Sequence, residues 1–104
     1  MSEEARVMKM MEAVKDPVRL RILFLLIKKG RTNVGDIASE FEITRPAISH
    51  HLKVLKEAGV VNSVKRGQEV YYSPNAHEVA EALRDLADRI ERSWPPDVRA
   101  RPLR

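Results

Sequence analysis

The chain of 104 residues contains no cysteine. This absence excludes a disulfide framework, a thiolate metal site and thiol-based redox sensing. Aromatic residues amount to only 5% of the chain, and no stretch comes near the roughly 18 consecutive apolar residues of a transmembrane helix. The amino-terminal segment alternates charged residues with Met and Val and lacks the apolar core of a signal peptide. We therefore expect a cytoplasmic protein with no membrane partner.

Glycine is also scarce, with four residues in the whole chain, and none of them forms a glycine-rich loop that binds nucleotides. No nucleophile stands in a pattern with a general base, and one domain of this size has little room for a substrate pocket. We therefore expect no enzymatic activity. So small a domain leaves much of its surface exposed, and we also expect it to form oligomers.

The net charge is +4, and the excess of positive charge is concentrated in one quarter of the sequence. Residues 44–68 carry five basic side chains and one acidic side chain, whereas the rest of the chain has 14 of each sign. Such clustering is typical of a surface that binds nucleic acid. An ordinary solvated surface could have the same composition. The positions of the charges on the predicted helices and strands are therefore needed to distinguish it from a nucleic-acid interface.

Helix boundary signals divide the first part of the chain into short elements. Apolar residues at helical spacing predict a first helix over residues 5–14. The segment DPVRLRILFLLIKKG predicts a second, central helix that begins at Asp16 and ends at Gly30. Asn33 predicts the start of a short third helix, whose apolar face includes Phe41.

The segment TRPAISHHLKVLKEAG predicts a fourth helix, with Thr44 as its amino-terminal cap, Pro46 in its first turn and Gly59 at its end. We expect about three or four residues between this helix and the short one before it. Two helices joined in this way form a helix-turn-helix, whose second helix enters the major groove of DNA.

The fourth helix has one apolar and one polar face. At 100° per residue, Leu52 and Leu55 fall within about 40° of Ile48, so these three side chains form a buried seam. The polar face lies between about 100° and 200° from Ile48, carries no acidic residue over residues 46–53, and offers donors to phosphates and base edges. Its members are Pro46, Ser49, His50 and Lys53.

Arg45 and the two adjacent histidines of this helix have different expected roles. Arg45, at its amino-terminal end, can form a bidentate contact with guanine. His51 lies near the buried flank, and we interpret it as a packed histidine with one satisfied ring nitrogen. His50 shares its face with Ser49 and Lys53, so we interpret it as a residue that contacts DNA.

A β-hairpin follows the fourth helix. Residues 60–64 and 69–72 are rich in β-branched and aromatic side chains, and Gly67 between them can adopt a positive φ. A basic hairpin directly after a helix-turn-helix predicts a winged helix. The DNA-binding residues that we predict are Thr44, Arg45, Pro46, Ser49, His50, Lys53, Lys65, Arg66 and Gln68.

A last helix is predicted over residues 76–93, with apolar residues at spacings of four, three and four. Such a seam has no evident partner inside one small domain, so we predict a two-fold homodimer built from the first and last helices. Residues 1–94 would form the DNA-binding and dimerisation domain, and residues 95–104 a flexible basic tail. The predicted interface comprises Val7, Met10, Met11, Val79, Leu83, Leu86 and Ile90.

The segments VKDPVRLRILFLL, NVGDIASEFEITRPAISHHLKVLKEAGVV and KRGQEVYYS resemble the ArsR/SmtB family of transcriptional regulators. The resemblance covers residues 8–90 and implies a mainly α-helical fold, a homodimeric winged helix with five helices. It also implies binding to an operator near the protein's own promoter, usually as a repressor that an effector releases. Arg45, Pro46, Ser49 and His50 match the family's base-reading positions. Arg45 and Pro46 replace the usual Gln-Ser pair, which shifts the expected base preference toward guanine.

The resemblance also raises the question of a metal effector. Many members sense metals through cysteines on the third helix, but the matching segment here, TNVGDIA, has no sulfur. A second family site lies between the last helices of the dimer, and it implies His77, Asp88 and Glu91 as tentative ligands, with Asn75 a poor fourth one. Such a set suits a divalent Zn, Ni or Co ion. The alternatives are surface roles for these residues and a non-metal effector, or none.

The sequence therefore predicts a sequence-specific regulator of transcription whose partner is double-stranded DNA. The alternative is a nonspecific architectural protein, because phosphate contacts supply affinity without sequence preference. A winged helix that binds protein instead would be expected to present an apolar or acidic face on the fourth helix.

Overall fold

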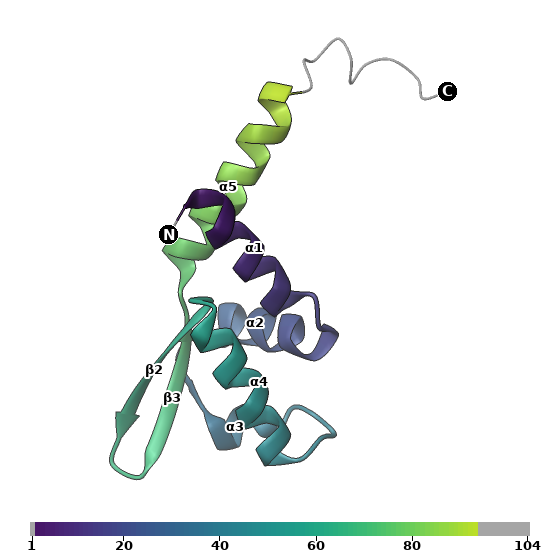
Figure 1. Ribbon diagram of the computed structural model, residues 1–104. Coiled ribbons are helices and arrows are strands. Elements are labelled where there is room, and N and C mark those ends of the chain that lie inside the picture. Colours follow the sequence, from purple (N-terminus) through teal and green to yellow (C-terminus); the bar gives the residue numbers. More distant parts are fainter. Residues whose placement is uncertain (1, 94–104) are drawn as a thin grey trace.

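The computed structural model describes residues 2–93, which form five helices and a small sheet (Figure 1). Trp94 and the predicted tail, residues 95–104, lie outside the described residues. The elements in chain order are α1 (Glu3–Val14), α2 (Pro17–Lys29), β1 (Thr32–Asn33), α3 (Val34–Ala38), α4 (Arg45–Glu57), β2 (Val61–Arg66), β3 (Glu69–Pro74) and α5 (Ala76–Ser93).

Side-chain caps begin four of the helices, Ser2 among them, and the sequence predicts the other three. The Asp16 carboxylate accepts a hydrogen bond from the Arg19 backbone N–H at 3.0 Å, and Asn33 Oδ1 accepts one from the Asp36 N–H at 2.7 Å. Thr44 Oγ1 accepts from the Ala47 N–H at 3.3 Å. These side chains satisfy backbone donors that have no partner inside the helix. The hydrogen bond from Arg19 holds the pKa of Asp16 below its usual value.

The predicted hairpin forms, although both strands run two residues further than predicted, so that Lys65 and Arg66 lie in β2. It belongs to a three-stranded antiparallel sheet with the order β1-β3-β2. A two-residue loop joins β2 to β3, and Gly67 takes a φ of 61° at its first position, as a type II′ turn requires. The short strand β1 was not predicted. It pairs Thr32 with Tyr72 and Asn33 with Tyr71, and thereby attaches the end of α2 to the wing.

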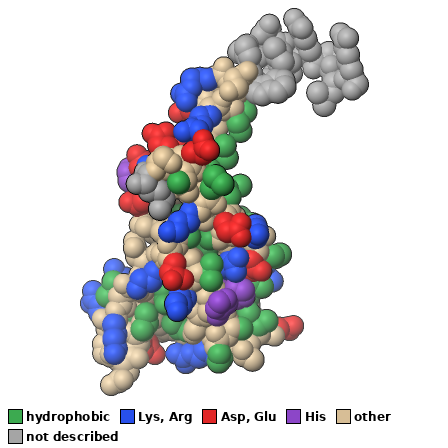
Figure 2. Space-filling view, in the orientation of Figure 1, with side chains coloured by type: hydrophobic (Ala, Val, Ile, Leu, Met, Phe, Trp, Pro, Cys, Tyr) green, Lys and Arg blue, Asp and Glu red, His purple; other side chains and the backbone are tan. Residues whose placement is uncertain are grey.

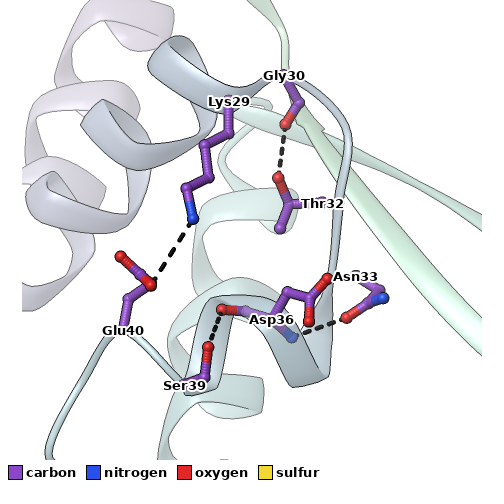
Figure 3. A network of polar contacts seen from close by, with 7 residues as sticks. All are labelled: Lys29, Gly30, Thr32, Asn33, Asp36, Ser39 and Glu40. Carbon is purple, nitrogen blue, oxygen red and sulfur yellow. Dashed lines mark hydrogen bonds and ion pairs between the residues drawn. The ribbon is translucent and has the colours of Figure 1, made fainter.

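The prediction for the third helix and the following turn was partly wrong. Helix α3 ends at Ala38, so residues 39–44 form a six-residue connection where three or four residues were expected. The Ser39 hydroxyl donates to the Asp36 carbonyl at 2.7 Å and satisfies a carbonyl at the helix end (Figure 3). Phe41 therefore lies in the connection, where it packs on the core with the Arg21 guanidinium 5.3 Å from its ring.

The core lies between α2, α4 and the start of β2, where Ile22, Leu26 and Val60 have no exposed surface. Helix α5 contributes only one buried side chain, Ala82, and its carboxyl end projects away from the body (Figure 1). Helix α1 packs against it, and Arg89 forms ion pairs with Glu3 and Glu4 at 3.7 and 3.5 Å. No helix of the described part of the chain is long and apolar enough to cross a membrane.

The cap at Asp16 makes a testable contribution to stability. Asp16→Ala should lower the free energy of unfolding by about 1 kcal/mol at pH 7, because the Arg19 N–H loses its acceptor. Since the folded protein lowers the pKa of Asp16, the wild type holds this contribution above about pH 4 and loses it as the carboxylate is protonated at lower pH. Urea denaturation of both proteins at pH 7, 5 and 3 measures the difference.

Asp16→Asn is the matched control, because an asparagine oxygen accepts the same hydrogen bond but does not titrate. Its effect should be smaller than that of alanine at pH 7. An alanine variant as stable as the wild type at pH 7, or one whose deficit grows toward pH 3, would contradict the assigned role of the cap.

Candidate nucleic-acid interface

The rotation of α4 is set by its apolar seam. Ile48, Leu52 and Leu55 are completely buried, which confirms the predicted inward face. The opposite face is exposed and, together with the wing, includes all of the predicted DNA-binding residues. Every one of these side chains is exposed: Thr44, Arg45, Pro46, Ser49, His50, Lys53, Lys65, Arg66 and Gln68.

The polar side chains of this face are free to meet a ligand. Among residues 2–93, Ser49 and Lys53 form no hydrogen bond or ion pair with the protein, and His50 contacts only the ring of His51, 5.9 Å away between centroids. Thr44 uses an oxygen lone pair for its cap and keeps its hydroxyl hydrogen available. The face therefore offers hydroxyl, imidazole and ammonium donors beside a helix amino terminus, which favours negative charge.

Arg45 lies over α3 in this structure. Its Nη1 atom is 3.9 Å from the position that a Cβ atom on Gly35 would occupy, and Asn33 Oδ1 is 3.5 Å from the same point. The first turn of α3 thus gives the guanidinium a surface to rest on at the start of α4. Arg45 stands where the sequence places it, at the amino end of the exposed face.

His51 is a packed histidine, as predicted, with 18% of its side chain exposed. Its Nδ1 atom lies 3.4 Å from Arg19 Nη1 and 4.0 Å from the Asp16 carboxylate. We assign Nδ1 as the unprotonated nitrogen that accepts from Arg19, because guanidinium can only donate and the Asp16 distance is too long for a hydrogen bond. Arg19 Nε also donates to the Ala13 carbonyl at 2.5 Å, so one side chain joins the α1–α2 corner to α4.

The wing carries its two cations on opposite faces. In the antiparallel register, Lys65 pairs with Val70 and Arg66 pairs with Glu69, and neighbouring residues of a strand point to opposite sides. Lys65 has the parity of Val61, whose side chain is buried in the core, so it points to the α4 side. Arg66 points to the outer side. Figure 2 shows Lys and Arg side chains over the hairpin and the adjoining lower part of the molecule.

The predicted dimer residues divide into buried and exposed sets. Met10 is buried inside the protomer with 5% exposure, and Val7, Val79 and Leu86 are half-buried. Met11, Leu83 and Ile90 keep about half of their surface exposed, and Met8, which the sequence analysis missed, is 65% exposed. Figure 2 shows hydrophobic side chains along one edge of α5 and charged ones along the other.

The tentative metal ligands do not meet within one protomer. His77 Nε2 lies 3.4 Å from the Glu81 carboxylate on the next turn, whereas Asp88 follows His77 by eleven residues, or about 16 Å of helix. Among residues 2–93 of one chain, no group of three His, Asp or Glu side chains could hold a metal ion. Their donor types suit Zn(II), but a complete site with Asp88 and Glu91 would need a second protomer.

Comparisons with known proteins agree with this arrangement. A family model described as "Bacterial regulatory protein, arsR family" matches residues 16–63. The transcriptional repressor SdpR of Bacillus subtilis (strain 168) is 41% identical over 81 residues, which cover 78% of this chain and 89% of that protein. The arsenical resistance operon repressor of the same strain is 37% identical over 68 residues, which cover 65% of each protein.

The solved structures include an ArsR-like transcriptional regulator from Rhodococcus sp. RHA1 with a TM-score of 0.78 and 30% identity. The match covers 93% of this chain and 90% of that one. The residues that match the family model run from the cap of α2 through the whole of α4 into β2. The chain therefore belongs to the arsR family of bacterial regulatory proteins, which are DNA-binding regulators of transcription.

Proposed function

We propose that the protein is a homodimeric repressor that binds an operator near its own promoter. The observation that carries this proposal is the exposed face of α4 over residues 45–53, which contains no acidic residue and which the buried seam of the same helix turns outward beside a basic wing. The names of its relatives support repression as the outcome of binding. Members of the family are regulators and form no class of enzymes, in agreement with the absence of catalytic patterns in the sequence.

In the proposed mechanism, each protomer inserts the start of α4, residues 45–53, into a major groove. Two copies related by a two-fold axis would read half-sites about 34–36 Å apart. Arg45, Ser49 and His50 would contact base edges, while Lys53 and the wing would contact phosphates. A bound dimer covers the promoter in the cytoplasm and blocks transcription.

The first test separates base readout from phosphate contact. His50→Ala should lower the preference for operator over random DNA by roughly 10-fold, because an imidazole contact to a base edge is lost. Lys65→Ala should weaken binding to every sequence alike and flatten the plot of log affinity against log salt by about one unit. Fluorescence anisotropy with the promoter fragment and a scrambled duplex, at four salt concentrations, measures both quantities.

The nonspecific architectural alternative predicts a different result. A protein that contacts phosphates alone would bind operator and scrambled DNA equally, whereas side chains that read bases predict a preference of roughly 1000-fold. Equal losses on both duplexes for the His50 and Lys65 variants would remove His50 from the base-reading set.

The dimer is the second part of the proposal, and the exposed apolar edge of α1 and α5 supports it. Leu83→Glu should give a monomer, because a partner helix would have to bury an unpaired carboxylate. Operator affinity should then fall by roughly 100-fold or more, since the two half-sites are no longer bound by one linked molecule. Sedimentation equilibrium gives the mass, and anisotropy gives the affinity.

Arg92→Glu is the control for this variant, because Arg92 lies nine residues after Leu83 and therefore about 180° around the helix. It places the same carboxylate on the opposite edge and should leave the dimer intact. A monomeric wild-type protein, or a dimeric Leu83→Glu variant, would contradict the proposed interface.

The effector can be assigned in the same binding assay. Titration with Zn(II), Ni(II) and a chelator tests the ligand set of His77, Asp88 and Glu91, which would have to come from both protomers. Release from the operator by metal in the wild type, and its loss in His77→Ala, would assign the metal site. Operator binding that ignores metals would exclude that site and direct the search to a non-metal effector.

A further inference from the structure

The outer side of the wing carries a basic hollow that lies apart from α4. One surface hollow of about 250 Å³ is lined by Arg31, Arg66 and Tyr71. A second hollow of about 460 Å³ shares Arg31 and Tyr71 and continues across β1 as far as Ser39. None of the predicted DNA-binding residues except Arg66 belongs to this surface, and Arg31 gave no signal in the sequence.

The unexpected strand β1 brings these residues together. Asn33 of β1 lies opposite Tyr71 of β3, and Arg66 of β2 lies opposite Glu69 of β3. Tyr71 and Glu69 are two residues apart on β3, so all four side chains point to the outer face of the sheet. Arg31 precedes Asn33 by two residues and lies on the same side. Two guanidinium groups that are 35 residues apart in the sequence thus flank one hollow.

The charges around this hollow leave the two arginines unengaged. Within the described residues, Arg31 and Arg66 form no ion pair or hydrogen bond. The nearby Glu69 carboxylate already accepts hydrogen bonds from Asn33 Nδ2 at 3.0 Å and from the Tyr71 hydroxyl at 3.3 Å. The hollow therefore keeps two unpaired cations beside an acid that has partners of its own.

Polar contacts fix the chain next to the hollow, between the end of α2 and the start of α3. Lys29 pairs with Glu40 at 3.7 Å, and the Thr32 hydroxyl donates to the Gly30 carbonyl at 2.9 Å (Figure 3). These contacts hold the chain on both sides of Arg31, between the end of α2 and the start of α3. Lys29 is engaged with Glu40, so the positive charge available to a ligand is that of Arg31 and Arg66.

A pair of guanidinium groups is suited to phosphate oxygens, because each presents a fork of donors in one plane. We propose that Arg31 and Arg66 clasp a backbone phosphate of the DNA that flanks the operator half-site, with the Tyr71 ring as the wall of the site. This inference rests on the proposed function. In this proposal the two cations of the wing contact different parts of the DNA. Lys65, on the α4 side, would contact DNA nearer the half-site than Arg66 does.

If Arg31 and Arg66 bind a flanking phosphate, operator affinity should depend on the length of duplex that extends beyond the half-sites. An operator duplex with flanks of about ten base pairs, one helical turn, should reach Arg31, whereas a duplex trimmed at the half-sites should not. On the long duplex, Arg31→Gln should flatten the salt slope by about 0.9, so its deficit in affinity changes about three-fold between 50 and 200 mM salt. On the trimmed duplex, the variant and the wild type should bind alike.

Lys28→Gln is the matched control, because it removes one exposed cation three residues before Arg31 that lines neither hollow of the wing. It should match the wild type on both duplexes. Thermal unfolding of the variants, followed by circular dichroism, checks that each is folded. Arg31→Gln should also keep the wild-type preference for operator over scrambled DNA, since it contacts no base.

Three results would overturn the site. The first is that Arg31→Gln shows the same salt slope as the wild type on the long duplex, and the second is that the variant loses equal affinity on both duplexes. The third is that millimolar inorganic phosphate stabilises the wild type but not the variant while flank length has no effect on affinity. That third result would assign the hollow as a site for a free anion. Failure of the proposed function is read from a different quantity. A wild-type protein with equal affinity for operator and scrambled DNA would overturn that function, whatever the flank comparison gives.

Discussion

The burial of three side chains on α4 determines what the rest of the protein can present to a ligand. Ile48, Leu52 and Leu55 lie in the core with no exposed surface, and burying each of them contributes about 1.5–3 kcal/mol. Turning the helix would expose this seam and bury Lys53, so the direction of the polar face is a consequence of core packing. Arg19 supports the same orientation through His51. In the proposed mode of binding, base recognition therefore depends on side chains that lie in the protein core.

Elements whose signals are local could be predicted from the sequence. Asp16, Asn33 and Thr44 each cap a helix with their own side chain, and the apolar spacing in α4 and α5 covers only a few turns. The wing could be predicted because Gly67 stands between two β-rich runs. In each case the partner atoms lie within a few residues of one another, so the sequence window contains the whole interaction.

Features that join distant segments could not be predicted in this way. Strand β1 has only two residues, and it exists because the middle strand of the sheet offers Tyr71 and Tyr72 as partners almost forty residues later. The contact of Arg19 with His51 and the hollow between Arg31 and Arg66 depend on the same kind of long-range pairing. A periodic pattern carries no information about such partners. The sequence therefore predicted the DNA-binding residues of α4 and of the hairpin, but not Arg31, which the pairing of β1 brings beside Arg66.

The two ends of the molecule differ in the polarity of their exposed surfaces, and α5 connects them. The end with α4 and the wing is basic and polar, whereas the projecting end of α5 buries only Ala82 and leaves an apolar edge (Figures 1 and 2). In the proposed dimer this edge sets the separation of the two copies of α4, which has to match successive major grooves on one side of DNA, one helical turn or a multiple of it apart. A change of packing along α5 would alter that separation and thus operator affinity without any contact to α4. An effector that binds between the α5 helices would act in this way, and because the chain has no cysteine it would bind without a thiolate ligand.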